Sequence, residues 1–330
     1  MTANVHTLRP FTPNKTVVIP GDLVSLARQY LSNAETFGLA NNTINAYRSD
    51  LQQFVGFCNA MDVTLVQHVT GVLMDDFTAG LIRGNGVKPR TAARKLAAVK
   101  ELMKFAVKRK LIKHNPEEDA TRIRFISPKV IAPDEGPILE MINNIPADTV
   151  TGIRDRAVFY LMYCAGMRNG GLRSLQVFDA ANPPEWTVTP GGVVRYKAKG
   201  GHTADTVADM TALTYINKWL EARKAWPKAR NNPVLFVTYR GTALSNQMLS
   251  MQIKQHGRRV GIKHITPHML RHRRIGEVAD KCGLQTAQRM AGHKDINTTG
   301  SIYGNVSAER VRHRILKDVP VGASKEKEAC

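Results

Sequence analysis

The chain of 330 residues carries 47 lysines and arginines against 27 aspartates and glutamates, which gives a formal net charge of +20. This length predicts two domains, each large enough to bury its own core, and the basic excess in both halves predicts a polyanionic partner, either nucleic acid or an acidic membrane surface. The longest apolar run, Ala157 to Met167, has about half of the roughly 20 residues that a bilayer crossing needs. We therefore exclude a membrane span.

The N-terminus and the cysteines indicate a cellular compartment. The first residues, MTANVHTLRPFTPNK, lack the apolar core of a signal peptide. Neither disulfide pairing nor metal-binding spacing is evident among the four cysteines, which are Cys58, Cys164, Cys282 and Cys330. We expect a protein of the reducing cytoplasm that has no zinc site.

The first half of the chain predicts a leader and then an all-helical domain. Residues 1–20 contain three prolines and little periodic pattern, which is typical of a flexible leader. In residues 21–126, apolar side chains recur at helical spacing. The predicted helices lie near Asp22–Leu31, Thr43–Cys58, Thr70–Leu81 and Lys88–Val107.

The second half predicts a mostly helical α+β domain, residues 137–318, after a polar linker rich in helix breakers at residues 127–136. Residues 319–330 are expected to form a disordered tail. Short β-rich runs separated by glycine-rich turns predict a three-stranded antiparallel sheet, at Trp186–Thr189, Val193–Lys197 and Thr206–Met210. Helices are predicted at Ile153–Cys164, Gly171–Val177, Leu213–Ala225, Asn246–Gly261, Pro267–Lys281, Leu284–Ala291 and from about Thr298. The predicted fold class is therefore mainly α.

The stretch TPHMLRHRR, Thr266 to Arg274, concentrates cationic side chains at a predicted helix start. Threonine can cap the free N–H groups of a helix, and proline suits the first helical position. His268 and Arg271 are three residues apart, so they share a face near the positive end of the helix dipole. Such a face favours an anion such as phosphate, and a solvated basic helix is the alternative.

Four further motifs place polar side chains near predicted turns or helix ends. AGMRNGGL places Arg168 between two helices, and YKAKGGHTAD places Lys199 at a turn. QRMAGHKD places His293 after a helix-ending glycine, and NTTGSIYGNV contains Tyr303. The ordered set Arg, Lys, His-x-x-Arg, Gly-His, Tyr resembles the tyrosine recombinase (phage integrase) family. The similarity spans most of the chain, because NNTINAYRSDLQQF and the basic helix ending KHNPEE resemble that family's core-binding domain.

The resemblance implies a site-specific recombinase that cleaves and rejoins DNA through a covalent 3′-phosphotyrosyl intermediate, without a metal or nucleotide cofactor. Breaking a phosphodiester in this way needs a nucleophile, groups that stabilise charge on the nonbridging oxygens, and a proton for the leaving oxygen. The family motifs assign these roles as follows: Tyr303 is the nucleophile, Arg168 and Arg271 hold the nonbridging oxygens, Lys199 protonates the departing 5′ oxygen, His268 exchanges protons with the tyrosine, and His293 donates a hydrogen bond to the phosphate.

The expected partner is double-stranded DNA, bound by a homotetramer on two sites with exchange of a C-terminal segment, for which SAERVRHRILKDV is the candidate. The short leader leads us to expect no separate arm-binding domain. Cations at helical spacing on two helices could contact DNA phosphates. The predicted DNA-binding residues are Arg90, Arg94, Lys95, Lys100, Lys104, Arg258 and Arg259.

Several alternatives stay open. Tyr303 could be a packing residue, Arg168 could cap the helix that ends at Gly166, and Lys197 competes with Lys199 for the turn. Gly171 stands where the family usually has an acidic residue, three places after the first arginine, and the segment from His293 to the tyrosine is one residue longer than is common. These departures motivate two rival functions: a DNA-binding protein of the same fold that lacks strand transfer, and a type IB topoisomerase-like nicking-closing enzyme.

Overall fold

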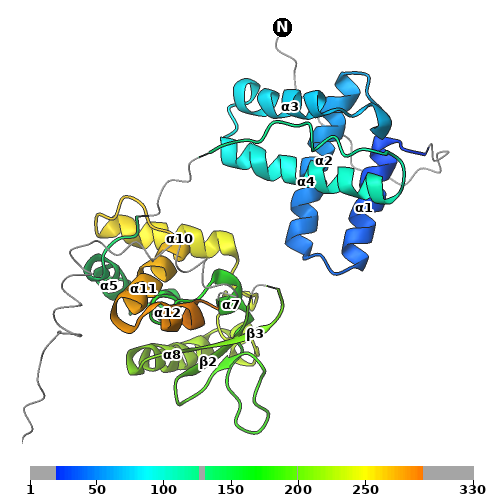
Figure 1. Ribbon diagram of the computed structural model, residues 1–330. Helices are drawn as coiled ribbons and strands as arrows, with labels where there is room; N and C mark the ends of the chain where they lie inside the picture. The colour runs from blue at the N-terminus through cyan, green and yellow to red at the C-terminus, as the bar shows by residue number, and fades with distance from the viewer. Residues whose placement is uncertain (1–19, 126–130, 199, 293–330) are drawn as a thin grey trace, which may run out of the picture. The chain divides into compact units, whose positions relative to one another are not determined.

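The computed structural model describes residues 20–125, 131–198 and 200–292, and the chain forms two compact units, residues 1–129 and 130–330 (Figure 1). In the described ranges the elements are helices and one small antiparallel sheet, which confirms the predicted fold class. None of the helices in these ranges has both the length and the apolar character needed to cross a bilayer. The predicted leader up to residue 19, the helix from Thr298 and the tail at residues 319–330 lie outside the described residues.

The N-terminal unit is built from four helices around an apolar core. Their core faces carry buried side chains such as Leu26, Phe54, Met74 and Leu102, at the periodicity that the sequence predicts. All four predicted helices are confirmed: α1 (Leu23–Thr36), α2 (Asn41–Ala60), α3 (Gly71–Ala79) and α4 (Pro89–Lys108).

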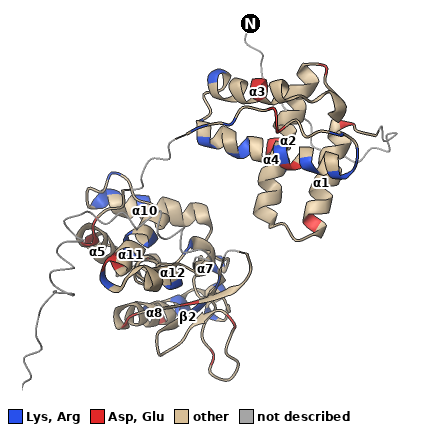
Figure 2. Cartoon of the chain, in the orientation of Figure 1, with Lys and Arg blue, Asp and Glu red and all other residues tan. Residues whose placement is uncertain are grey.

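A buried carboxylate ties α2 to α4 in this unit. Asp50 on α2 is 1% exposed and accepts hydrogen bonds from Arg94, at 2.9 Å from Nη2, and from Lys95, at 3.2 Å from Nζ. Because an unpaired buried charge is costly, these cations are needed by the fold itself. On the basic face that Figure 2 shows along α4, Arg94 and Lys95 therefore have a structural role, and other cations of this face are left for a ligand.

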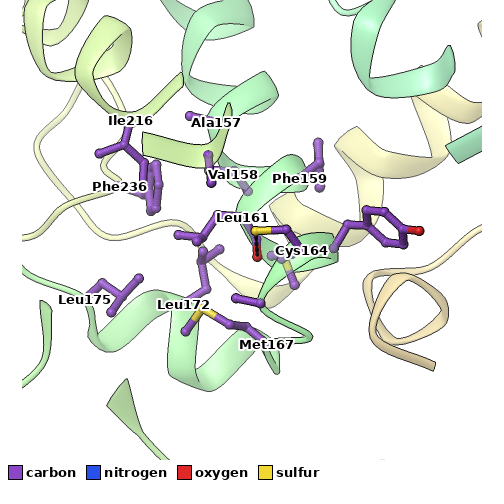
Figure 3. Packing of buried hydrophobic residues seen from close by; sticks show 14 of the residues in the cluster. Ala157, Val158, Phe159, Leu161, Cys164, Met167, Leu172, Leu175, Ile216 and Phe236 are labelled. Carbon is purple, nitrogen blue, oxygen red and sulfur yellow. Dashed lines mark hydrogen bonds between the residues drawn. The ribbon is translucent and has the colours of Figure 1, made fainter. Parts of the chain in front are cut away.

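The second unit is organised around a helix that is buried on nearly all sides. This helix, α6 (Val150–Cys164), contains most of the long apolar run noted in the sequence, and Figure 3 shows Val158 and Leu161 packed with Ile216 and Phe236. A helix that is hydrophobic all round belongs in a core. The other helices are α5 (Glu135–Asn143), α7 (Asn169–Ser174), α8 (Met210–Ala222), α9 (Pro227–Arg230), α10 (Asn246–Arg259), α11 (Pro267–Cys282) and α12 (Leu284–Ala291).

Helix α5 was not predicted from the sequence, and helix α7 ends earlier than predicted. Helix α5 begins at Glu135, inside the predicted linker, because a proline at position 137 is tolerated in a first turn, where N–H groups have no intrahelical partner. Helix α7 ends at Ser174 instead of Val177. The N–H groups of Gln176 and Val177 donate to the carbonyls of Trp186 and Pro233, so this backbone is bonded to other segments and leaves the helix.

The sheet has the predicted antiparallel order, β1 (Thr187–Val188), β2 (Val193–Lys197) and β3 (Thr203–Val207). Val193 pairs with Val207, and Arg195 pairs with Asp205. The prediction that the third strand covers Thr206–Met210 was wrong, since the strand starts at Thr203 and Met210 is already the first residue of α8. The cause is Asp209, whose side chain accepts a hydrogen bond from the Ala212 N–H at 2.8 Å and starts the helix.

This cap can be tested by substitution. Asp209→Ala is expected to lower the free energy of unfolding by about 1–2 kcal/mol, because it leaves an N–H group of the first turn unpaired. The Tyr160 hydroxyl, 3.0 Å from Asp209, also loses its acceptor. Urea unfolding followed by circular dichroism measures the change. Asp209→Asn is the matched control, since asparagine caps helices equally well. An equal loss in both variants would contradict the capping role.

Candidate active site

Two arginines that are far apart in the sequence meet at the end of α12. Arg271, in the first turn of α11, is 2% exposed and donates from Nη2 to the Ala291 carbonyl at 2.5 Å. Arg168 donates from Nη1 to the same carbonyl at 3.3 Å. The structure therefore brings together both arginines that the sequence predicts to hold the nonbridging oxygens of a phosphate.

The end of α12 explains why both guanidinium groups bind the Ala291 carbonyl. The last carbonyls of a helix have no intrahelical donor. Ala291 is the final residue of α12, and Gly292 follows in the left-handed conformation, with φ of +56°. Arg271 also donates to the Gly166 carbonyl at 2.5 Å, after α6. Arg168 was alternatively expected to cap the helix ending at Gly166, but its observed bond runs to the Ala291 carbonyl, and Arg271 donates to the Gly166 carbonyl.

Arg168 keeps donor capacity for a ligand. It lies at the start of α7 with an extended backbone and a half-buried side chain. A guanidinium has five N–H donors, and one of those of Arg168 is seen to donate within the described part of the chain. This bond anchors one nitrogen of the group, and the remaining donors suit a phosphate oxygen.

His268 completes a cluster of cationic and polar groups. It is exposed in the first turn of α11, after the Thr266 cap, whose hydroxyl accepts from the Met269 N–H at 3.3 Å. Partial burial of the ring, and then the nearby charges of Arg271 and Arg168, lower the pKa of His268 below its ordinary value of 6.5. The imidazole is therefore neutral at pH 7 and can accept a proton.

The pKa of His268 gives a prediction for Arg168. Removing one of the nearby cations in Arg168→Ala should raise the pKa of His268 toward 6.5, as measured by NMR titration of the imidazole. In the wild type, the depressed pKa means that the unfolded state binds the proton more readily. The associated stability is full above pH 6.5 and is lost as the pH falls through the folded-state pKa. Arg173→Ala is the control, and an equal rise there would contradict a direct effect of Arg168.

Lys199, His293 and Tyr303 lie outside the described residues. The residues on either side of position 199 form a hairpin. The Ala198 N–H donates to the His202 carbonyl at 2.8 Å, and Gly200 and Gly201 both have positive φ. Lys197, the competitor for the turn, places its ammonium 4.9 Å from the centre of the Trp186 ring. This cation–π contact engages Lys197 on the strand.

The glycine at position 171 has a steric explanation in this chain. A Cβ atom at this position would lie 2.5 Å from Cδ2 of Tyr196, which is closer than carbon atoms can approach. An acidic side chain therefore cannot occupy this place while Tyr196 stays where it is. The group that holds Arg168 is instead the Ala291 carbonyl. Sequence reasoning missed this carbonyl, because every residue carries one and no motif marks it.

The predicted DNA-binding cations fall into three groups. Lys100 and Lys104 form ion pairs with carboxylates, at 3.0 Å from Glu117 and 3.0 Å from Glu101. The Lys104–Glu101 pair is exposed, and exposed ion pairs contribute little to stability, so Lys104 can exchange its carboxylate for a DNA phosphate at small cost. Arg94 and Lys95 are paired with Asp50 as described above. Arg90, Arg258 and Arg259 are exposed.

Comparison with known proteins identifies the class. Residues 134–310 match the phage integrase family, and residues 28–110 match the phage integrase N-terminal SAM-like domain. The chain therefore belongs to the phage integrase family, which confirms the resemblance found in the motifs. The first match contains Arg168, His268 and Arg271, and the second covers much of the four-helix unit.

The chain is similar to tyrosine recombinases over most of their length. A tyrosine recombinase XerC from Herpetosiphon aurantiacus is 30% identical over 285 residues, covering 83% of this chain and 87% of the relative. A tyrosine recombinase XerD from Staphylococcus aureus is 28% identical over 280 residues, covering 83% and 91%.

Solved structures show the same fold. The XerH recombinase bound to palindromic difH in a post-cleavage complex has a TM-score of 0.65 at 20% identity, covering 88% of this chain and 83% of that one. A lambda integrase tetramer bound to a Holliday junction has a TM-score of 0.64 at 16% identity, covering 85% and 77%.

Proposed function

We propose that this protein is a site-specific DNA recombinase that cleaves and rejoins strands through a covalent 3′-phosphotyrosyl intermediate. The observation that carries the proposal is the convergence of Arg168 and Arg271 on the Ala291 carbonyl, with His268 close to both charges. Paired guanidinium groups make bidentate, charge-assisted contacts with phosphate oxygens. The positive field of this cluster attracts the DNA backbone and stabilises charge that develops during cleavage.

In the proposed reaction, the Tyr303 phenol oxygen attacks the scissile phosphorus. A P–O bond to tyrosine forms, and the bond to the 5′ oxygen breaks. The phenol proton goes to neutral His268, Lys199 protonates the departing 5′ oxygen, and His293 donates a hydrogen bond to the phosphate. The phosphotyrosine ester keeps the bond energy, so a 5′ hydroxyl from another strand can reverse the step and join the ends. These steps use protein side chains alone.

Two other tyrosines of the second unit, Tyr160 and Tyr163, have surroundings that are poorly suited to a nucleophile. Tyr160 donates to Asp209, and its burial, followed by the charge of this carboxylate, raises its pKa to about 12. Tyr163 donates to Glu277 at 2.9 Å, and burial above all raises its pKa still further. A phenol that resists deprotonation is a weak nucleophile. Tyr160 and Tyr163 are therefore poor alternatives to Tyr303 for this role.

The proposed assembly is a homotetramer that brings two double-stranded DNA sites together in the cytoplasm. The likeness to a lambda integrase tetramer on a Holliday junction supports this state of assembly. Exchange of the C-terminal segment SAERVRHRILKDV between protomers would connect neighbouring active sites, and this segment lies outside the described residues. The exposed cations Arg90, Arg258 and Arg259 would contact phosphates on the duplex.

Covalent capture tests the proposal. A binding site is first selected from a random duplex library with the purified full-length chain, and is then made as a radiolabelled, nicked half-site from which the cleaved fragment diffuses away. We expect a labelled protein adduct that resists denaturant and disappears on protease treatment. Binding without an adduct would favour the rival DNA-binding function.

Strand exchange between two sites distinguishes a recombinase from the topoisomerase-like alternative. Two duplexes of different length, each with the selected site, should yield recombinant products of new length in the presence of the protein. Relaxation of a supercoiled plasmid without any exchange between sites would instead favour a topoisomerase-like enzyme. Both readouts use the same DNA sequence, so differences in binding affinity do not affect the comparison.

A further inference from the structure

A buried carboxylate lies on α11, the helix that carries His268 and Arg271, but away from both. Glu277 is 8% exposed and follows Arg271 by six residues, about 9 Å along the helix at 1.5 Å per residue. A carboxylate in the interior is costly unless it is paired and hydrogen-bonded. Its partners therefore indicate what this charge contributes to the protein.

The partners of Glu277 come from α11 itself and from α6. Arg273 donates from Nε to Glu277 Oε1 at 2.6 Å, and Nη1 of Arg274 lies 3.6 Å from Oε2. These two cations of the same helix balance the charge, which a lysine could also do. The hydroxyl of Tyr163, in the last turn of α6, donates to Glu277 Oε2 at 2.9 Å and is 3% exposed as a residue. Within the described residues, Tyr163 is thus the partner that joins Glu277 to another element.

Two polar contacts therefore hold α11 against the end of α6. Arg271 donates to the Gly166 carbonyl, and Glu277 accepts from Tyr163, three residues earlier in the chain. Successive residues of a helix turn by about 100°, so the side chains of Arg271 and Glu277 leave α11 in directions about 120° apart. Contacts in two directions, about 9 Å apart along the axis, oppose both sliding and rotation of the helix.

Apolar packing alone specifies the position of this part of α11 weakly. The apolar cluster that α11 shares with α12 consists, among the described residues, of Ile275, Ala279, Ala287 and Ala291, with Val278 at its edge. Alanine has a small side chain, so a small shift of the helix changes few contacts. A hydrogen bond, in contrast, has a preferred distance and angle. The contact between Tyr163 and Glu277 therefore restricts the position of α11 more narrowly than this cluster does.

We propose that Glu277 is a positioning residue for the arginine pair, and that it acts through Tyr163. This inference rests on the proposed recombinase function. Without the contact, α11 can shift on α6, and Arg271 then loses its geometry with Arg168 at the Ala291 carbonyl. A displacement of about 1 Å in a catalytic group is enough to slow a reaction strongly. The loss should therefore appear in the cleavage rate and not in DNA affinity.

The first test removes a hydroxyl without changing any charge. Tyr163→Phe should reduce the rate of adduct formation at saturating half-site by about 10-fold, with an unchanged dissociation constant for the half-site. Tyr215→Phe, which removes a hydroxyl bonded to Asn143, is the matched control and should cleave at the wild-type rate. Thermal unfolding of each variant sets the temperature of the assay, well below every melting temperature.

A mutant cycle tests whether Tyr163 and Glu277 act as one contact. Glu277→Gln should also slow cleavage, because the amide replaces a charged acceptor by a neutral one. The double variant with Tyr163→Phe should be slower than the more impaired single variant by less than about two-fold, since two groups that act together are not additive. If one single variant does not fold, the other still tests the role through its cleavage rate.

The imidazole of His268 reports on the position of Arg271 without any DNA. Burial, and then the charges of Arg271 and Arg168, lower the pKa of His268. Tyr163→Phe leaves the net charge unchanged, so a rise in this pKa toward 6.5, measured by NMR titration, would report a displaced guanidinium. The control Tyr215→Phe should leave the pKa of His268 unchanged. A purely structural contact would lower the melting temperature and change neither the pKa of His268 nor the cleavage rate.

Three results would overturn the inference: a wild-type cleavage rate in Tyr163→Phe, independent and additive losses in the mutant cycle, or an unchanged pKa of His268 in Tyr163→Phe. A wild-type chain that forms no adduct would instead contradict the proposed function. The titration of His268 still shows in that case whether the contact holds Arg271, so the two failures can be told apart.

Discussion

Tyr303→Phe is expected to eliminate the covalent adduct, with a fall in the cleavage rate of at least about 10⁴-fold, as is typical when a nucleophile is removed. The substitution deletes one oxygen and keeps the aromatic ring, so packing and DNA affinity should change little. The measurement is adduct formation on the nicked half-site under single-turnover conditions. Binding is followed in parallel by the shift of the labelled duplex in a native gel.

The matched control for this prediction is Tyr239→Phe. Tyr239 belongs to the same unit and is 60% exposed, and its hydroxyl accepts a hydrogen bond from Arg240 at 2.9 Å. We expect this variant to form the adduct at the wild-type rate. An adduct that persists in Tyr303→Phe, or one that is lost in Tyr239→Phe, would assign the nucleophile to another residue. Peptide mapping of the labelled adduct then identifies it.

Arg271→Lys is expected to reduce cleavage by about 10²-fold or more while DNA binding is kept, the order found when a charge contact to the transition state is lost. The structure gives a second reason for the size of the effect. The guanidinium spans the Gly166 and Ala291 carbonyls with two different nitrogens, at 2.5 Å each. A single ammonium cannot span both and also reach a phosphate.

Because Arg271 is buried, its loss also affects stability, and the experiment must separate the two effects. Rates are compared well below the melting temperature of the variant, at saturating DNA. Arg274→Lys is the matched control on the same helix, since Arg274 donates to the Cys164 carbonyl at 3.2 Å and lies 3.6 Å from Glu277. Equal losses of binding and cleavage in Arg271→Lys would argue against a role in the transition state.

Local signals in the sequence were sufficient for most elements of the fold. Apolar side chains at helical spacing placed α1 to α4, and Thr266 followed by Pro267 placed the start of α11, where the structure shows the threonine cap. These signals act between residues a few positions apart, through capping bonds and one buried face. The order of the motifs also identified the family before any three-dimensional information was used.

Predicted boundaries were wrong where a segment has signals for two different elements. The third strand was predicted too late in the chain because Thr206 and Val207 are β-forming residues, whereas the cap at Asp209 places Met210 in α8. The competition between a strand and a helix cap is decided by hydrogen bonds, which propensity does not describe. The end of α7 was displaced for the same kind of reason, by backbone bonds to distant segments.

By itself the sequence determined the fold class and the family and predicted the residues of the candidate active site, because these depend on periodicity, caps and motif order. Tertiary structure alone decided what holds those residues: the Ala291 carbonyl between Arg168 and Arg271, and the pairing of Arg94 and Lys95 with buried Asp50. It also explained Gly171 through the ring of Tyr196. Contacts of this kind join residues far apart in the chain, often through backbone atoms that all residues share, so no sequence pattern can encode them.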